Sequence, residues 1–249
     1  MQIYWHGFSS MRIEAKNADT SATLVTDPYQ NASGLRFPRT LEPDVVVMSH
    51  PDQAEYNLES FTNSPYLISE PGEYEKAGIF VRGVPSSEVV KKKTDDDEEG
   101  EETEEDEEAQ EEEEKPVQKE KESKKDSGTQ TVVYRFDAED ISIGFLGQID
   151  RQLTNREIET LGEIDILMIP VGGGSVLDAK SAQKIIDVIE PRIVIPMYYD
   201  VDGVKEKLDS IDSFCKVFGS CTRENVNKFK IASKDLPQDS MKIVVIDRA

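Results

Sequence analysis

Short apolar runs separated by polar turns recur along most of this 249-residue chain. Over residues 1–90 the runs are rich in β-branched residues and are interrupted by Gly, Pro, Asp and Asn, which predicts a first half built mainly of strands. Ile3, Tyr4 and Trp5 are expected in the core or on a strand face of this half.

The second half mixes strands with helices. Residues 155–161 and 179–189 carry apolar positions at helical spacing, and Asp178 is placed to cap the second of these helices. Strands are predicted for the compact apolar runs 131–136, 141–146, 164–169, 193–196 and 243–246. The alternation indicates an α/β protein that is long enough to bury a sizeable core.

A charged segment, residues 91–127, interrupts this pattern. It is almost free of apolar residues, and sixteen of the twenty residues from Asp95 to Glu114 are acidic. Such a segment cannot bury enough apolar surface to offset the entropy lost on ordering. We therefore predict a disordered acidic insert within a single domain that spans residues 1–249. Without those sixteen residues, the formal net charge would fall from -22 to -6, which is an ordinary surface charge.

Composition also bears on location and redox state. No stretch approaches the roughly 18 consecutive apolar residues of a membrane helix, and the first residues lack a basic stretch followed by an apolar one, so a cytoplasmic protein without membrane association is predicted. Cys215 and Cys221 are too few for a disulfide framework and have neither zinc-ribbon nor Cys-x-x-Cys spacing. They could meet in a loop, but two free thiols are expected.

An apolar run, Val45 to Met48, ends abruptly in a polar cluster that begins with Ser49 and His50. This is the pattern of a buried strand that delivers side chains to a site at its carboxyl end. The cluster resembles the metal-binding motif Thr/Ser-His-x-His-x-Asp-His of the metallo-β-lactamase superfamily. Further segments resemble, in the same order, the branch of that superfamily that includes L-ascorbate-6-phosphate lactonases; they are residues 3–14, 23–28, 70–79, 169–174 and 189–199.

The resemblance implies a metallo-β-lactamase-like αββα four-layer sandwich of the α/β class and a zinc-dependent hydrolase. Of the histidines of the motif, however, only His50 is kept, and the histidine of the family's opening Trp-x-Gly-His segment is Phe8 here. Six further ligand positions are occupied by Asp52, Ala54, Glu55, Glu88, Gln148 and Tyr198. Since the chain has only two histidines, His6 and His50, no site of three imidazoles can form, and zinc is not expected.

The sequence also allows sites of other kinds. His50 with the carboxylates of Asp52, Glu55 and Glu88 could form a mixed site for Mn²⁺ or Mg²⁺, which prefer oxygen ligands. Backbone amides of the loop formed by Gly172, Gly173 and Gly174 could bind an anion, although the loop lacks P-loop spacing. A serine nucleophile beside His50 is not favoured, because no Gly-x-Ser-x-Gly segment is present.

Two hypotheses of function follow. In the first, no residue is catalytic and no cofactor is needed; the protein is a pseudo-hydrolase that binds a ligand in the old cleft, or a basic protein or cations through the acidic insert, which would repel nucleic acid. In the second, it is a metal-dependent hydrolase of a lactone or a phosphorylated small molecule with a re-formed carboxylate-rich site. The sequence names neither the partner nor the oligomeric state.

Overall fold

The computed structural model describes residues 1–17, 20–50, 52–85, 131–219, 221–223 and 226–249. Met1–Ser87 and Thr129–Ala249 together form one compact unit. The predicted insert at 91–127 and the predicted ligand position Glu88 lie outside the described residues.

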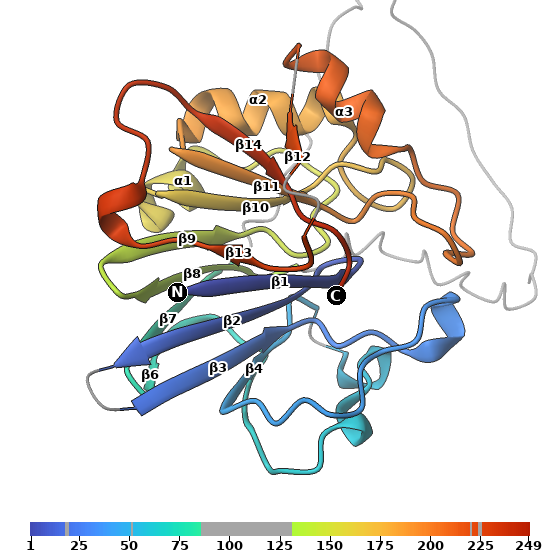
Figure 1. The fold of residues 1–249 in the computed structure, drawn as a ribbon, viewed down its shortest axis with the longest axis vertical. Coiled ribbons are helices and arrows are strands. Elements are labelled where there is room, and N and C mark those ends of the chain that lie inside the picture. Colours follow the sequence, from blue (N-terminus) through green and yellow to red (C-terminus); the bar gives the residue numbers. More distant parts are fainter. Residues whose placement is uncertain (18–19, 51, 86–130, 220, 224–225) are drawn as a thin grey trace, which may run out of the picture. The chain divides into compact units, whose positions relative to one another are not determined.

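The first of two sheets has six strands in the order β13-β1-β2-β3-β4-β5 (Figure 1). The strands are β1 (Gln2–Gly7), β2 (Ser10–Asn17), β3 (Thr20–Thr26), β4 (Val45–Val47), β5 (Tyr66–Ile68) and β13 (Phe229–Lys230). The strands β1, β2 and β3 pair antiparallel, whereas β3, β4 and β5 run parallel. The carboxyl ends of β3 and β4 therefore lie side by side, and this brings Asp27 next to Ser49.

The second sheet has eight strands in the order β12-β14-β11-β10-β9-β8-β7-β6. They are β6 (Gly72–Lys76), β7 (Ile79–Val84), β8 (Val133–Ala138), β9 (Ile141–Phe145), β10 (Ile166–Pro170), β11 (Ile193–Met197), β12 (Thr222–Arg223) and β14 (Lys242–Val245). The strands β6 to β9 are antiparallel, and β9, β10, β11, β14 and β12 are parallel. Every residue of β9, β10 and β11 is buried, as expected for parallel strands covered on both faces.

The helices α1 (Asn155–Leu161), α2 (Ala179–Ile189) and α3 (Ile211–Val217) lie on the side of the second sheet (Figure 1). The helix α1 begins at a capping box formed by Thr154 and Glu157, and α2 begins at Asp178, whose side chain accepts a hydrogen bond from the Ser181 amide. The loops beside the first sheet carry 3-10 turns at η1 (Asn31–Ser33), η2 (Gln53–Glu55) and η3 (Leu58–Ser60), and a fourth, η4 (Ser233–Asp235), precedes β14.

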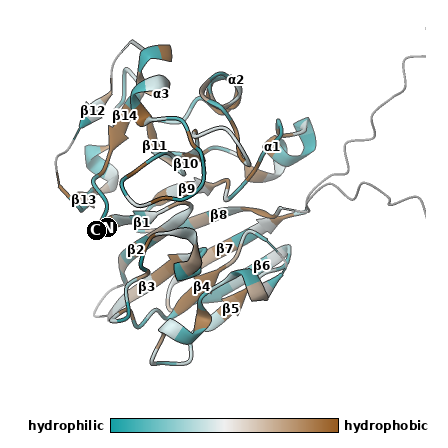
Figure 2. Cartoon of the chain, turned by 90° about the vertical axis from the view of Figure 1, so that its right-hand side faces the viewer, coloured by the Kyte–Doolittle hydropathy of each residue, from teal (hydrophilic) through white to brown (hydrophobic). Residues whose placement is uncertain are grey.

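The main core cluster takes residues from both sheets and from all three helices, and hydrophobic residues are frequent along the strands (Figure 2). Trp5 of β1 packs on Tyr199 with ring centroids 4.5 Å apart, and Phe136 and Phe145 stack within the second sheet. A second apolar cluster gathers at the ends of the strands of the first sheet and includes Phe8 and Tyr29. Four members of this cluster, Phe8, Tyr29, Tyr56 and Tyr198, line the pocket described below.

Most predicted elements are confirmed, including both predicted helices and Asp178 as a cap. The expectation of two free thiols is wrong, because Cys215 and Cys221 form a disulfide where the chain turns from α3 towards β12. None of the helices in the described part of the chain has the length and apolar character needed to cross a bilayer.

Candidate functional site

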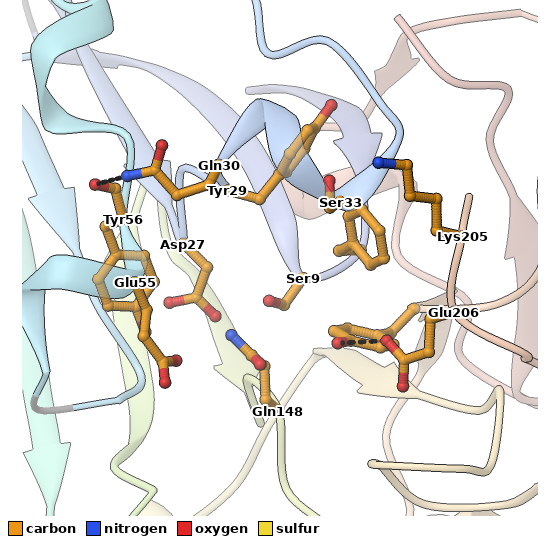
Figure 3. Close-up of a pocket in the computed structure, with 12 residues that line it drawn as sticks. Ser9, Asp27, Tyr29, Gln30, Ser33, Glu55, Tyr56, Gln148, Lys205 and Glu206 are labelled. Atoms are coloured by element: carbon orange, nitrogen blue, oxygen red, sulfur yellow. Dashed lines mark hydrogen bonds between the residues drawn. The ribbon is translucent and has the colours of Figure 1, made fainter. Parts of the chain in front are cut away.

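A pocket of about 400 Å³ opens at the carboxyl ends of β3 and β4 (Figure 3). Loops that follow β1, β3, β4, β9 and β11 all contribute to it. Its lining consists of Phe8, Ser9, Asp27, Tyr29, Gln30, Ser33, Glu55, Tyr56, Gln148, Tyr198, Lys205 and Glu206. Ligand sites of α/β proteins commonly form at strand ends of this kind.

Asp27 lies at the centre of the lining and follows directly after β3. Its side chain is buried, and Ser49 donates to it twice, from its amide to Oδ1 and from Oγ to Oδ2, each at 2.7 Å. The side chains of Ser9 and Tyr56 also form hydrogen bonds with this carboxylate. Burial raises the pKa of Asp27 to about 6, and the hydrogen bonds from Ser49 partly oppose that rise.

Gly147 lies directly against Ser49 and close to Asp27. Its φ is +57°, and a β-carbon added there would lie 2.2 Å from Cβ of Ser49. A side chain at this position would therefore push Ser49 away from Asp27. The next residue, Gln148, points its amide into the pocket beside Asp27 (Figure 3).

Aromatic rings form one wall of the pocket. Phe8 makes edge contacts with Tyr29 and Tyr198, and both pairs of ring centroids are 5.2 Å apart. The Tyr198 amide donates to the Phe8 carbonyl at 3.0 Å, which holds the two loops together. Phe8, Asp27 and Tyr198 all have positive φ, a conformation that costs free energy for non-glycine residues and tends to occur at functional sites.

Charged and polar groups lie at the rim. Glu206 accepts hydrogen bonds from Tyr198 Oη at 3.1 Å and from Ser175 Oγ at 2.5 Å. The Lys205 ammonium donates to the Ala32 carbonyl at 3.1 Å. Ser33 Oγ is buried and has no hydrogen-bond partner among the described residues.

The predicted ligand positions after β4 form a separate local cluster. His50 Nδ1 accepts a hydrogen bond from the Asp52 amide at 3.1 Å and lies 3.7 Å from Glu55 Oε2. The Asp52 carboxylate in turn accepts from the Ala54 amide at 2.9 Å. Asp52, Ala54 and Glu55 are exposed, and the contacts of His50 and Asp52 are thus mainly within their own loop.

The structure brings only some of these positions to the pocket. Glu55, Gln148 and Tyr198 line it together with Phe8, whereas His50, Asp52 and Ala54 are outside its lining. Within the described residues, which exclude Glu88, no group of three or more His, Cys, Asp or Glu side chains is arranged to hold a metal ion.

The glycine loop lies next to the pocket. A β-carbon at Gly172 would lie 2.2 Å from the Tyr198 carbonyl oxygen, so glycine is needed for the close approach of these two chains. The Gly173 amide donates to the Leu177 carbonyl at 2.9 Å, and Asp209 lies beside the same glycine. Anion binding by Gly172, Gly173 and Gly174 stays a prediction.

Sequence reasoning missed the residue at the centre of the pocket. The resemblance covers residues 23–28 but did not single out Asp27, and aspartate is rarely buried, so its position in the sequence gave no sign of a buried carboxylate. Tyr29, Tyr56, Lys205 and Glu206 were also missed, since nothing local marks them. Ser49, considered as a nucleophile beside His50, instead directs its hydroxyl to Asp27.

Comparison with known proteins identifies relatives of this chain. Residues 2–198 match the Beta-lactamase superfamily domain. A UPF0173 protein of Pyrococcus abyssi is 45% identical over 42 residues, which are 17% of this chain and 20% of that protein. A UPF0173 metal-dependent hydrolase of Nanoarchaeum equitans is 42% identical over 48 residues, or 18% of this chain and 22% of that protein. The chain thus matches about a fifth of the length of each of these two relatives.

A solved structure matches over nearly the full length of both chains. It is a Thermotoga maritima protein assigned to the Zn-dependent hydrolases of the metallo-beta-lactamase superfamily, with a TM-score of 0.70 and 25% identity. The match covers 98% of this chain and 97% of that protein. The predicted two-sheet α/β architecture of this superfamily is confirmed by the match and by the sheet topology.

Proposed function

Because this chain belongs to the Beta-lactamase superfamily domain family, we propose that it is a pseudo-hydrolase that binds a small molecule in the pocket around Asp27 without a metal ion. The pocket lies at the strand ends where the sequence resemblance places the metal site of the hydrolases. In this proposal the binding site has the same location as the metal site of the hydrolases but binds a ligand without catalysis.

The observation that carries the proposal is the chemistry of the side chains at the former ligand positions. Phe8 offers a hydrocarbon ring, Gln148 a neutral amide and Tyr198 a phenol, none of which is a usual zinc ligand. Burial raises the pKa of Tyr198, which keeps its hydroxyl protonated and so removes phenolate as a ligand. The residues described at these positions do not fit a catalytic zinc ion.

The pocket does fit a small molecule. It combines aromatic walls with a few convergent polar groups, which are the usual features of a ligand site, and its volume lies in the range of such sites. Three of the residues that line it keep positive φ. Strained backbone of this kind persists where the surrounding structure holds it in place.

The test is elemental analysis of the purified, tag-free protein after dialysis against zinc, with the Thermotoga maritima relative treated in parallel as a control. We expect well below one equivalent of zinc, and no zinc-dependent hydrolysis of lactones or phosphate esters. Stoichiometric zinc, or hydrolysis that zinc restores, would overturn the proposal.

One observation favours the alternative hypothesis of a re-formed oxygen site. Glu55, one of the carboxylates of the predicted site, lines the pocket together with Asp27 and Glu206, and carboxylates suit Mn²⁺ and Mg²⁺, although no group of three among the described residues is arranged to hold a metal ion. A divalent ion that binds there should raise the melting temperature of the protein, and Glu206→Gln should abolish that rise. An equal rise of the melting temperature in the wild type and in Glu206→Gln would show that the ion binds elsewhere.

A further inference from the structure

The buried charge of Asp27 has no basic partner. The groups that stabilise its carboxylate are neutral, namely the Ser49 amide and the hydroxyls of Ser9, Ser49 and Tyr56. Of the ion pairs among the described residues, none includes Asp27. Buried charges in proteins are usually paired or bind a cation. Here a positively charged molecule bound in the pocket would supply the opposite charge.

The rest of the lining adds to the negative charge. Glu55 and Glu206 contribute two further carboxylates, whereas Lys205 is the single basic residue in the lining. The Lys205 ammonium also points towards Ser33 and away from Asp27, and it donates to the Ala32 carbonyl (Figure 3). A phosphorylated or carboxylated ligand would therefore meet like charge in most of the pocket.

Aromatic side chains complete the environment. Phe8, Tyr29, Tyr56 and Tyr198 line the pocket, and the faces of such rings carry partial negative charge. Organic cations bind to aromatic walls combined with carboxylates, because the ring faces attract the charge and the apolar surface accepts the alkyl groups. A fully hydrated metal ion gains little from such walls.

We propose that the pocket binds a small organic cation, an amine or quaternary ammonium compound, whose positive group lies near Asp27 and among the rings of Phe8 and Tyr198. This rests on the proposed function, since a metal ion bound there would neutralise the same carboxylates.

The probe experiment is calorimetry of the full chain with matched ligands. Choline and putrescine carry positive charge; 3,3-dimethylbutan-1-ol has nearly the shape of choline without its charge, and succinate is an anion. We expect saturable binding of choline or putrescine, at least about tenfold weaker binding of the neutral isostere, and no binding of succinate.

Three variants locate the binding. Glu206→Gln should weaken the binding of the cation several-fold, and Lys205→Gln should strengthen it, because each changes the charge of the lining in a known direction. Glu14→Gln is a matched control, since Glu14 also accepts a hydrogen bond from a tyrosine hydroxyl but lies on β2 outside the pocket. Asp27→Asn should abolish binding, provided that its melting transition remains cooperative.

The outcomes separate the two proposals. No saturable binding of either cation, equal binding of the isostere, or unchanged binding in both Glu206→Gln and Lys205→Gln would overturn the inference. Binding of the isostere as tight as that of choline, or binding of succinate, in a metal-free protein would overturn it while leaving the pseudo-hydrolase intact. Stoichiometric zinc in the pocket would overturn the pseudo-hydrolase and, with it, the binding of an organic cation.

Discussion

Ser49 donates two hydrogen bonds of 2.7 Å to the two carboxylate oxygens of Asp27. One comes from its amide and one from its hydroxyl, and together they join the carboxyl ends of the parallel strands β3 and β4. The pair thus fixes both a buried charge and the geometry of the pocket base.

Removal of the Ser49 hydroxyl tests how much its hydrogen bond to Asp27 contributes to stability. Ser49→Ala would leave a buried carboxylate oxygen with one partner fewer, which should lower the free energy of unfolding by about 1–3 kcal/mol. Urea denaturation measures the change. Ser60→Ala is the control, because Ser60 Oγ only donates to the nearby Asn57 carbonyl; it should cost less than about 1 kcal/mol. Equal losses in the two variants would contradict the special role of the pair.

Gly147 should not tolerate a side chain. Gly147→Ala adds a β-carbon that collides with Ser49 and also forces alanine into a left-handed conformation, so we expect a loss of about 2 kcal/mol or more. Gly219→Ala separates the two effects, because Gly219 has a φ of +82° but no atom within 4 Å of the added carbon. Thermal unfolding of both variants should show the larger loss at Gly147. The opposite order would show that the collision relaxes without cost.

Two buried groups should give opposite dependences of stability on pH. Burial, assisted by the nearby Arg12, lowers the pKa of His6 to about 4, so its contribution to stability is present above pH 6.5 and is lost as the pH falls. Burial raises the pKa of Asp27 to about 6, so its contribution is present below about pH 4 and is lost as the pH rises through 6. Between about pH 4 and pH 6, the contributions of the two groups to stability change with pH in opposite directions.

Single-residue variants should reveal how each group makes stability depend on pH. Relative to the wild type, His6→Gln should gain stability as the pH falls from 6.5 to 4, and Asp27→Asn should gain stability as the pH rises from 4 to 6, each by up to about 3 kcal/mol. Chemical denaturation across this range measures both. Parallel pH profiles of either variant and the wild type would show that the group does not titrate in this way.

The acidic insert gives a prediction based on chain geometry. Val84 and Val133 are cross-strand partners in β7 and β8, so the two ends of the chain that border the insert are already held together. Deletion of residues 91–127 should therefore leave the melting temperature nearly unchanged, because the entropy of loop closure depends weakly on loop length. A large fall would show that the segment belongs to the folded core. If the insert binds a basic partner, binding should be lost on deletion and should weaken steeply as salt is added.

The sequence pattern predicted helices and strands, in which apolar residues recur at a regular spacing. It missed features that form only where distant segments of the chain meet. The periodicity of 179–189 and the cap at Asp178 gave α2 its bounds, since both signals are local. The helix α3 was not predicted, because only Ile211 and Phe214 of its seven residues are buried. The pairing of Cys215 with Cys221 depends on the turn after α3, which no motif marks.

The candidate site was predictable only in part for the same reason. The resemblance located Phe8, Gln148 and Tyr198, which line the pocket, but it also pointed to Asp52 and Ala54, which do not. The burial of Asp27 arises because chain segments far apart in sequence meet around it. No window of sequence contains that information.

The left-handed backbone of Phe8 and Tyr198 has a practical consequence for protein engineering. Both residues hold a positive φ at positions where the sequence resemblance places histidines. A histidine adopts this conformation at least as readily as phenylalanine or tyrosine. Replacing both residues by histidine would thus change side chains on a backbone that already holds a positive φ at the two positions, which makes this chain a starting point for a designed metal site.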